Sequence, residues 1–263
     1  MSTSFPMDGK RVRFSGDTNV GLKRDHNEDS FYLPLNERLA IVADGMGGHA
    51  SGEVASRMAV DAIVGYFRDT EGEQDLTWPF KVDRGHGRTI NRMTTAIKLA
   101  NQQIFEEAER KPECHGMGTT VVSALFLDDV LVIGHVGDSR LYRVRDGAID
   151  QITEDHSLLN DYIRMKRLSE NEIAAFPHKN VIVRALGMKS SIEVDIIAEH
   201  PRLGDLFVLC SDGLSGMVSD ADIAALAMEE ADLDKLCESL IGSANGNGGI
   251  DNITVVCARL EPL

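Results

Sequence analysis

Short runs of Val, Ile and Leu recur along the chain at the length of a β-strand, and they constrain its fold more than any other feature. Ten such runs can be read from the sequence: RVRFSG, SFYL, LAIVAD, TTVVSALFL, VLVIGHVGD, RLYRVRDGAIDQI, VIVRAL, EVDIIAE, DLFVLCSD and NITVVCARL. Short polar turns interrupt them at 128–129 and 146–147, and the second is an Asp-Gly pair, which is typical of a β-hairpin. We therefore expect antiparallel sheets rather than a parallel βαβ series.

Helical periodicity appears in three segments, at 51–67, 89–110 and 219–244, with Asp and Ser available as N-caps in the last. These segments lie between blocks of strands. The order predicts an α+β fold with helices on the outer faces of packed sheets. A length of 263 residues suits one large domain or two small ones, and no clear domain boundary is visible.

The net charge of −15 argues against nucleic acid and anionic membranes as partners, because the mean field of the protein repels both. No run approaches the roughly 20 apolar residues of a membrane-spanning helix, and the first residues lack the apolar stretch of a signal peptide. The four cysteines are widely spaced without a CxxC pair, which is typical of buried thiols in a reducing compartment. We expect a cytoplasmic protein.

Aspartates fall repeatedly at the ends of the apolar runs, beside or near glycine. The four candidates are Asp44, Asp138, Asp212 and Asp251, and the NEDS segment at 27–30 adds a fifth acidic position. A carboxylate at a strand end, next to a glycine that lets backbone or solvent approach, is well placed to hold a hard cation. The alternative is that Asp and Gly merely begin turns after strands, which is common at any one site.

Several carboxylates with few thiols or paired histidines favour Mg²⁺ or Mn²⁺ over zinc. Carboxylates gathered without neutralisation would raise one another's pKa, and two or more cations resolve that conflict. Two neighbouring hard ions are suited to phosphoryl chemistry, because they activate a water and offset the phosphate charge. Arg24, five positions before Asp29, is the natural phosphate ligand of such a centre, although a solvated surface charge is the better explanation when Arg24 is considered alone.

A competing motif lies at 45–50, where GMGGHA fits the G-x-G-x-x-A pattern of dinucleotide-binding proteins. Two facts weaken it. Asp44 would point a carboxylate at the pyrophosphate, and Asp61 falls inside the predicted helix instead of after a second strand. The histidines say less: His49 is a phosphate contact or a turn residue, and His135 is a satisfied core histidine.

Eight motifs occur together and in the order found in the metal-dependent protein phosphatases: RDHNEDSFY, VADGMGGHASGEVAS, GMGTTVV, GHVGDSRLYRVRDG, TEDHSL, VIVRALG, LCSDGLSGMVSD and GGIDNITVV. The chain resembles this family, also called PPM or type 2C, and is most similar to its bacterial serine/threonine phosphatases. The resemblance runs from about residue 11 to 260. It implies one catalytic domain over 1–263, a sandwich of two antiparallel sheets flanked by helix pairs, with a flap subdomain at about 155–180.

The resemblance also implies a metal centre of two Mn²⁺ or Mg²⁺ ions at one edge of the sandwich, with a third position in bacterial members. By similarity, Asp44 bridges the ions and the Gly45 carbonyl binds one of them. Asp212 and Asp251 complete the other, and Asp138 with Asp212 holds the third. Glu28 and Asp29 act largely through metal-bound waters, Arg24 binds phosphate, and Asp44 and Asp29 form the catalytic set.

The implied activity is hydrolysis of phosphoserine and phosphothreonine on proteins, by direct attack of a metal-bound hydroxide. Met46 stands where animal members carry a His proposed as general acid, so a water held near Asp29 is our candidate proton donor. Expected partners are phosphorylated proteins, including a Ser/Thr kinase that the enzyme opposes, and we expect a monomer. The alternative is a catalytically silent member that binds phosphoproteins as a regulator; the loss of a ligand aspartate would mark it, and none is missing.

Overall fold

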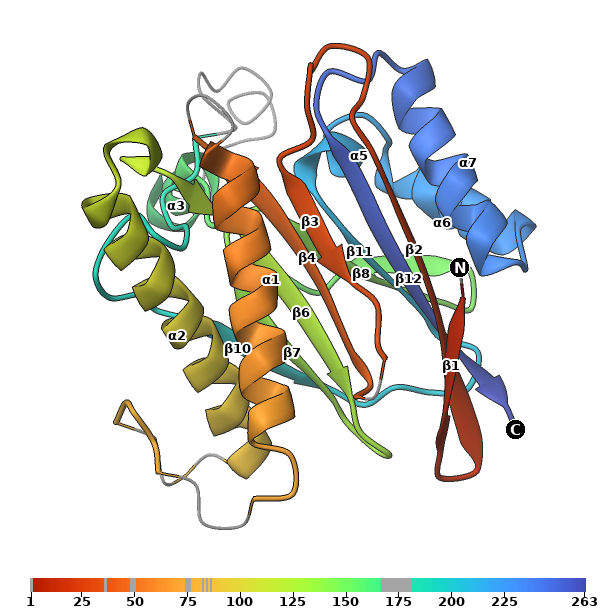
Figure 1. The fold of residues 1–263 in the computed structure, drawn as a ribbon. Helices are drawn as coiled ribbons and strands as arrows, with labels where there is room; N and C mark the ends of the chain where they lie inside the picture. The colour runs from red at the N-terminus through yellow and green to blue at the C-terminus, as the bar shows by residue number, and fades with distance from the viewer. Residues whose placement is uncertain are drawn as a thin grey trace.

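Two antiparallel sheets form the centre of the protein (Figure 1). The computed structural model describes residues 2–35, 37–47, 51–73, 77–81, 83, 85, 87–166 and 181–263. The first sheet has the order β1 (Thr3–Met7), β2 (Lys10–Asn19), β12 (Ile253–Pro262), β11 (Leu206–Cys210), β8 (Arg140–Arg145) and β9 (Ala148–Gln151). The second has the order β10 (Asp195–Glu199), β7 (Leu131–Val136), β6 (Val121–Phe126), β4 (Leu39–Met46) and β3 (Asp29–Tyr32), with β5 (Gly118–Thr119) paired to β4.

Helix pairs cover the two outer faces of this sandwich. Helices α1 (Ser51–Asp69) and α2 (Arg88–Arg110) lie on the second sheet, and α6 (Asp220–Glu229) and α7 (Leu233–Gly246) lie on the first (Figure 1). Three short helices complete the described part: η1 (Pro112–Cys114), α3 (Leu158–Lys166) and α5 (Asp212–Ser215). The predicted α+β sandwich is thus confirmed.

A row of aromatic rings joins the inner faces of the sheets. Phe14 of β2, Phe126 of β6 and Phe207 of β11 are fully buried, and successive ring centroids lie 5.3 and 5.6 Å apart, edge to face. Strands β6, β7 and β11 are buried on both faces, because a sheet lies on one side and helices on the other. This explains why their sequences are continuous apolar runs rather than alternating ones.

Local signals placed most elements correctly. The hairpin between β8 and β9 turns at Asp146 and Gly147, whose φ angles of +52° and +80° are those of a type I′ turn. The helical segment at 219–244 is two helices, because Asp232 caps α7 by accepting hydrogen bonds from the Asp234 and Lys235 amides. Ser219 caps α6 in the same way. All four cysteines are free and buried, as predicted.

Two expectations about strands were wrong. VIVRAL is no sheet strand: its Ile182 and Leu186 form only isolated bridges, to Ser157 and Thr119, so its apolar residues serve local contacts. The edge strand β1 was missed because its TSFPM sequence contains Pro6 and few β-branched residues. The predicted flap lies outside the described residues from 167 to 180. None of the described helices is both long and apolar enough to cross a membrane.

The close packing of α2 on β7 gives a first prediction. A Cβ atom at Gly134 would lie 2.6 Å from Ile97 Cδ1 and 2.8 Å from Met93 Cγ, both on α2. Gly134→Ala should therefore lower the free energy of unfolding by about 1–3 kcal/mol through overpacking. Gly242→Ala is the matched control: Gly242 is exposed inside α7 with nothing within 4 Å of its Cβ position. It should stabilise the helix by about 0.5–1 kcal/mol. Urea unfolding measures both, and equal stability of Gly134→Ala and the unmodified chain would contradict the packing argument.

Candidate metal centre

Carboxylates from both sheets converge at one edge of the sandwich. Asp29 begins β3, Asp44 lies near the end of β4, Asp138 follows β7, Asp212 begins α5 directly after β11, and Asp251 precedes β12. The β3–β4 register places Asp29 opposite Asp44. The sequence pattern that predicted these positions as one cluster is therefore matched by their place in the fold.

Asp29 joins the two sheets. It belongs to the second sheet, but its Oδ2 accepts hydrogen bonds from Ser211 Oγ (2.8 Å) and Thr254 Oγ1 (2.7 Å), which follow β11 and lie in β12 of the first. Its Oδ1 is buried and has no hydrogen-bond partner in the part of the chain that the structure describes. Sequence reasoning missed Ser211 and Thr254, since single hydroxyls inside apolar runs carry no local signal of such a contact.

The backbone of Asp44 is fixed by Thr119, which ends β5, and by Thr120, which lies between β5 and β6. Its N–H donates to Thr120 Oγ1 (3.0 Å), and its carbonyl accepts from the Thr120 amide and the Thr119 hydroxyl, both at 2.9 Å. The neighbouring Gly45 donates its N–H to the Glu28 carbonyl. A Cβ at Gly45 would lie 2.1 Å from the Gly52 carbonyl oxygen, so only glycine allows α1 to begin so close to the carboxylates.

Arg24 and Glu28 stand at the solvent side of the cluster. Arg24 Nη2 forms an ion pair with Asp251 Oδ2 at 2.7 Å and remains half exposed, so it is neither free nor a distant surface charge. Glu28 donates its N–H to Asn252 Oδ1 and accepts a hydrogen bond from Ser56 Oγ at its carbonyl. Its Oε1 is buried without a hydrogen-bond partner, with a ring nitrogen of His26 3.5 Å away.

Burial and mutual repulsion make the ionised form of the cluster costly. Burial raises the pKa of Asp29 to about 7, against hydrogen bonds from Thr254 and Ser211 that lower it. Burial also raises the pKa of Asp138 to about 7, with the charges of Asp212 and Asp155 adding to the effect. The pKa of Asp44 lies well above its ordinary value, first through burial and then through the surrounding carboxylates.

The donor set fits hard divalent cations. Among the described residues, three buried carboxylate oxygens of the cluster have no hydrogen bond, on Glu28, Asp29 and Asp138, and a cation would satisfy such atoms. All ligand candidates are oxygens, as Mg²⁺ and Mn²⁺ prefer. Within the described ranges, no group of three or more His, Cys, Asp or Glu side chains has a ready-made ligand arrangement.

A pocket of about 330 Å³ opens beside these carboxylates. Its walls include Asp138, Asp212 and Asp251, the end of α5 at 215–217, and Leu159 and Asn160 at the start of α3. The pocket therefore gives a group of substrate size access to the cluster.

Comparisons with known proteins identify the family of this chain. A family model described as "Protein phosphatase 2C" matches residues 23–245. The chain belongs to the protein phosphatase 2C family. It is similar to a serine/threonine phosphatase, stp, of Listeria monocytogenes, with 36% identity over 251 residues that cover 93% of this chain and 94% of the relative.

Solved structures of this family superpose on nearly the whole chain. The Mycobacterium tuberculosis serine/threonine phosphatase PstP matches with a TM-score of 0.81 and 35% identity, covering 95% of this chain and 99% of its own. A structure of the PstP catalytic domain in complex with two manganese ions matches with a TM-score of 0.79 and 35% identity, covering 95% and 98%. Membership in this family replaces the dinucleotide interpretation of the 45–50 motif, whose residues 48–50, including His49, lie outside the described ones.

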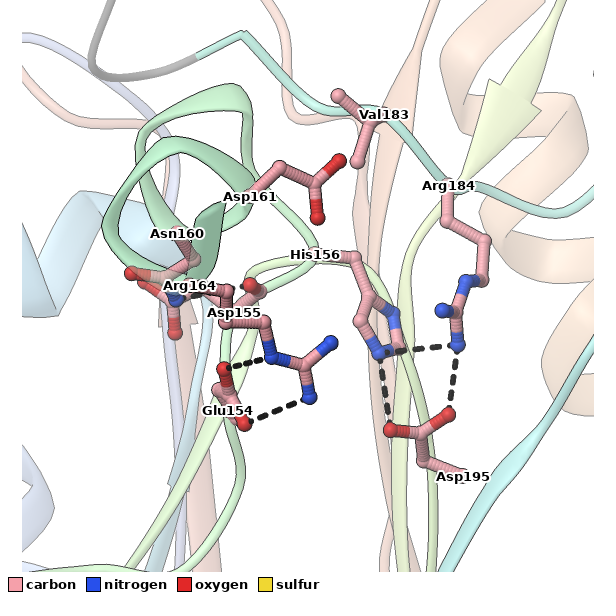
Figure 2. Close-up of a pocket in the computed structure, with 9 residues that line it drawn as sticks. All are labelled: Glu154, Asp155, His156, Asn160, Asp161, Arg164, Val183, Arg184 and Asp195. Carbon is pink, nitrogen blue, oxygen red and sulfur yellow. Dashed lines mark hydrogen bonds and ion pairs between the residues drawn. The ribbon is translucent and has the colours of Figure 1, made fainter. Parts of the chain in front are cut away.

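A second polar pocket of this protein phosphatase 2C chain, about 200 Å³, lies where the predicted flap joins the sandwich (Figure 2). In it, Asp195 Oδ1 accepts from Arg184 Nη1 (2.6 Å) and Asp195 Oδ2 lies 3.2 Å from His156 Nε2. His135, expected as a satisfied core histidine, is fully buried, but among the described residues neither of its ring nitrogens has a partner at strict hydrogen-bond geometry. Its ring packs on His156, with centroids 4.7 Å apart.

The raised pKa of Asp138 predicts how metal-free stability depends on pH. Between the ordinary value of 3.8 and about 7, Asp138 binds a proton in the folded chain but not in the unfolded one. Its contribution to stability is thus present at low pH and is lost as pH rises through this window. The amide introduced by Asp138→Asn cannot titrate. We compare the free energy of unfolding of the unmodified chain with that of Asp138→Asn in EDTA. Their difference, unmodified minus variant, should fall by up to about 1 kcal/mol per pH unit from about pH 4 to 7 and should stay constant above pH 7.

The control is Asp69→Asn, at the exposed end of α1 with a side chain 73% accessible. The free energy of unfolding of Asp69→Asn should depend on pH in the same way as that of the unmodified chain. Parallel profiles for Asp138→Asn and the unmodified chain in EDTA would show that the Asp138 carboxyl is not strained by burial.

Proposed function

We propose that this chain is a Mn²⁺- or Mg²⁺-dependent serine/threonine protein phosphatase that hydrolyses phosphoserine and phosphothreonine on proteins. The observation that carries the proposal is the convergence of five strand-end carboxylates, with unpartnered buried oxygens, beside an arginine and an open pocket. The silent regulatory alternative is not favoured, because every carboxylate of the set is present. The two manganese ions of the PstP catalytic domain support a binuclear centre at this edge.

We assign the ion ligands to residues of both sheets. Asp44, the Gly45 carbonyl, Asp212 and Asp251 hold two ions, Asp138 with Asp212 holds a third, and Glu28 and Asp29 act through ordered water. When bound, the ions supply an activated water and offset the negative charge of the phosphate. They also stabilise the ionised form of Asp44, whose pKa is raised first by burial and then by the neighbouring carboxylates.

Arg24 binds the phosphate oxygens. In the structure its guanidinium is paired with Asp251, one of the ligand candidates. Turning from Asp251 to the phosphate leaves that carboxylate free for a cation and gives the substrate a bidentate partner.

Asp29 orients the water that protonates the leaving oxygen. Its Oδ2 is held by Ser211 and Thr254, so its unpartnered Oδ1 has a fixed direction. Met46, near the end of β4, has no proton to give, so this role falls to solvent held by a carboxylate.

The substrates are phosphorylated proteins, among them a Ser/Thr kinase that this enzyme opposes, and the chain acts as a monomer. The pocket beside the carboxylates is open to solvent, which suits a phosphorylated side chain carried on a polypeptide. Size-exclusion chromatography with light scattering tests the oligomeric state, and dephosphorylation of an autophosphorylated bacterial kinase tests the partner.

Loss of Asp44 should abolish turnover. Because Asp44 is the residue we place between both ions, Asp44→Ala should lower kcat/KM by roughly a hundredfold or more. The assay is hydrolysis of p-nitrophenyl phosphate and a phosphothreonine peptide with Mn²⁺, with Mg²⁺ and with EDTA, which should abolish activity. Asp69→Ala at the end of α1 is the control and should keep full activity. Near-normal turnover of Asp44→Ala in Mn²⁺ would refute the assignment.

Removal of the Arg24 guanidinium should act mainly on substrate binding. Arg24→Ala should raise KM for the phosphopeptide about tenfold or more, and Arg24→Lys should recover only part of this, since an ammonium cannot bind two oxygens in parallel. Lys23→Ala, at the exposed neighbouring position, serves as the control. An unchanged KM in Arg24→Ala would exclude phosphate recognition by Arg24.

A further inference from the structure

His156 lies at a junction between the catalytic edge and the base of the predicted flap. Its N–H donates to the Gly137 carbonyl (2.8 Å), and its own carbonyl accepts from the Val183 amide (2.9 Å). The next residues pair across the same junction, because Leu158 N–H donates to the Val181 carbonyl at 2.8 Å. One residue thus touches the turn that carries Asp138 and the segment that returns from the flap.

The side chain of His156 adds a second bond to the same turn. Its Nδ1 lies 3.0 Å from the Gly137 amide, which can only donate, so Nδ1 is the unprotonated nitrogen and accepts. Together the backbone and side chain of His156 hold both polar groups of Gly137, the residue directly before Asp138.

The opposite ring nitrogen fixes the tautomer. Since Nδ1 accepts, Nε2 carries the hydrogen and donates to Asp195 Oδ2, 3.2 Å away (Figure 2). Arg184 Nη1 lies 3.1 Å from Nε2, but both atoms are donors, so their contact is indirect: each donates to a different oxygen of Asp195. The carboxylate therefore orients the ring, and Arg184 holds the carboxylate.

The Gly137 turn has little freedom on its other side. Gly137 has a φ of +115°, and a Cβ there would lie 2.6 Å from the Thr120 side chain. The turn is therefore packed between Thr120 and His156. His156 borders the 200 Å³ pocket, and its ring reaches the Asp138 turn through the Gly137 amide, while its chain neighbours Asp155 and Ser157 border the 330 Å³ pocket.

We infer that His156 is a positioning residue: held as the Nε2–H tautomer by Asp195 and Arg184, it clamps the Gly137 amide and so sets the Asp138 carboxylate for a divalent cation. The inference rests on the proposed function and adds a residue to it that the carboxylate pattern did not contain. It assigns the Asp195–Arg184 pair to the cation site, although neither residue borders it.

Two substitutions separate the two bonds of the ring. His156→Asn places an amide oxygen where Nδ1 accepts from Gly137 and loses the donor to Asp195. His156→Gln places an amide nitrogen near Asp195 and loses the acceptor for Gly137. Both remove the ring and its contact with His135, so they are matched in the packing they lose.

Mn²⁺ binding, measured by calorimetry and by electron paramagnetic resonance of free Mn²⁺, gives the readout. Asp138→Asn should abolish one class of sites. His156→Gln should weaken that same class about tenfold or more, His156→Asn should weaken it less, and the other sites should be unchanged. A purely structural role would affect both variants alike, or all sites together. Unchanged Mn²⁺ binding in His156→Gln, or the absence of any class that Asp138→Asn removes, would overturn the inference.

If His156→Gln does not fold, Asp195→Asn decides, because an amide can accept from only one of the two donors that share the carboxylate. A severalfold weakening of the Asp138 class supports the inference and unchanged binding overturns it. Phosphatase assays on the same proteins keep the two proposals apart. If the unmodified chain is inactive but the variants change Mn²⁺ binding as expected, the proposed function is refuted and the role of His156 stands. If the unmodified chain is active but the variants bind Mn²⁺ normally, the proposed function stands and the role of His156 is refuted.

Discussion

The cost of ionising carboxylates that are buried close together is the constraint on which the rest of the structure depends. Asp29, Asp44, Asp138 and Asp212 all have a raised pKa, each mainly because burial removes water from the charged group. In a protein that binds no cation, such carboxylates are normally found apart from one another and in contact with solvent. Here neutral hydroxyls hold Asp29, and Arg24 pairs with Asp251 at the exposed rim. The backbones that carry these carboxylates therefore hold them close together, and hard cations, when bound, offset their charge.

The sandwich of two sheets holds these backbones in place. The Phe14, Phe126 and Phe207 rings fix the sheets against each other, and at the catalytic edge β11 ends and its antiparallel neighbour β12 begins. There the chain packs backbone against backbone: a Cβ at Gly213 would lie 1.9 Å from the Asn252 carbonyl oxygen. This approach brings Asp212 and Asp251 to neighbouring positions from segments distant in sequence. Glycine is needed at such places because it lets two backbone segments approach closely, not because it makes the chain flexible.

The parts of the site that the sequence predicted are those with a local signature. Asp44, Asp138 and Asp212 end apolar runs beside glycine, so strand length and composition were enough to place them. The bonds of Asp29 to Ser211 and Thr254 span 182 and 225 residues, and no local pattern contains such distances. VIVRAL shows the opposite failure. Its composition is that of a strand, but the segment makes only single bridges, one to Thr119 of β5 and one to Ser157.

Thr120 explains why the two halves of the carboxylate cluster keep their relative positions. Its amide and hydroxyl bind the backbone of Asp44, and the same hydroxyl lies 2.6 Å from Ser139 Oγ. Because Thr120 Oγ1 accepts from the Asp44 amide, its hydrogen is free to donate to Ser139, directly after Asp138. Its methyl group packs under Gly137. A displacement of the Asp138 turn therefore presses on the residue that holds Asp44. Cation ligands from the β4 end and from the β7–β8 turn are in this way coupled through one side chain, before any ion is present.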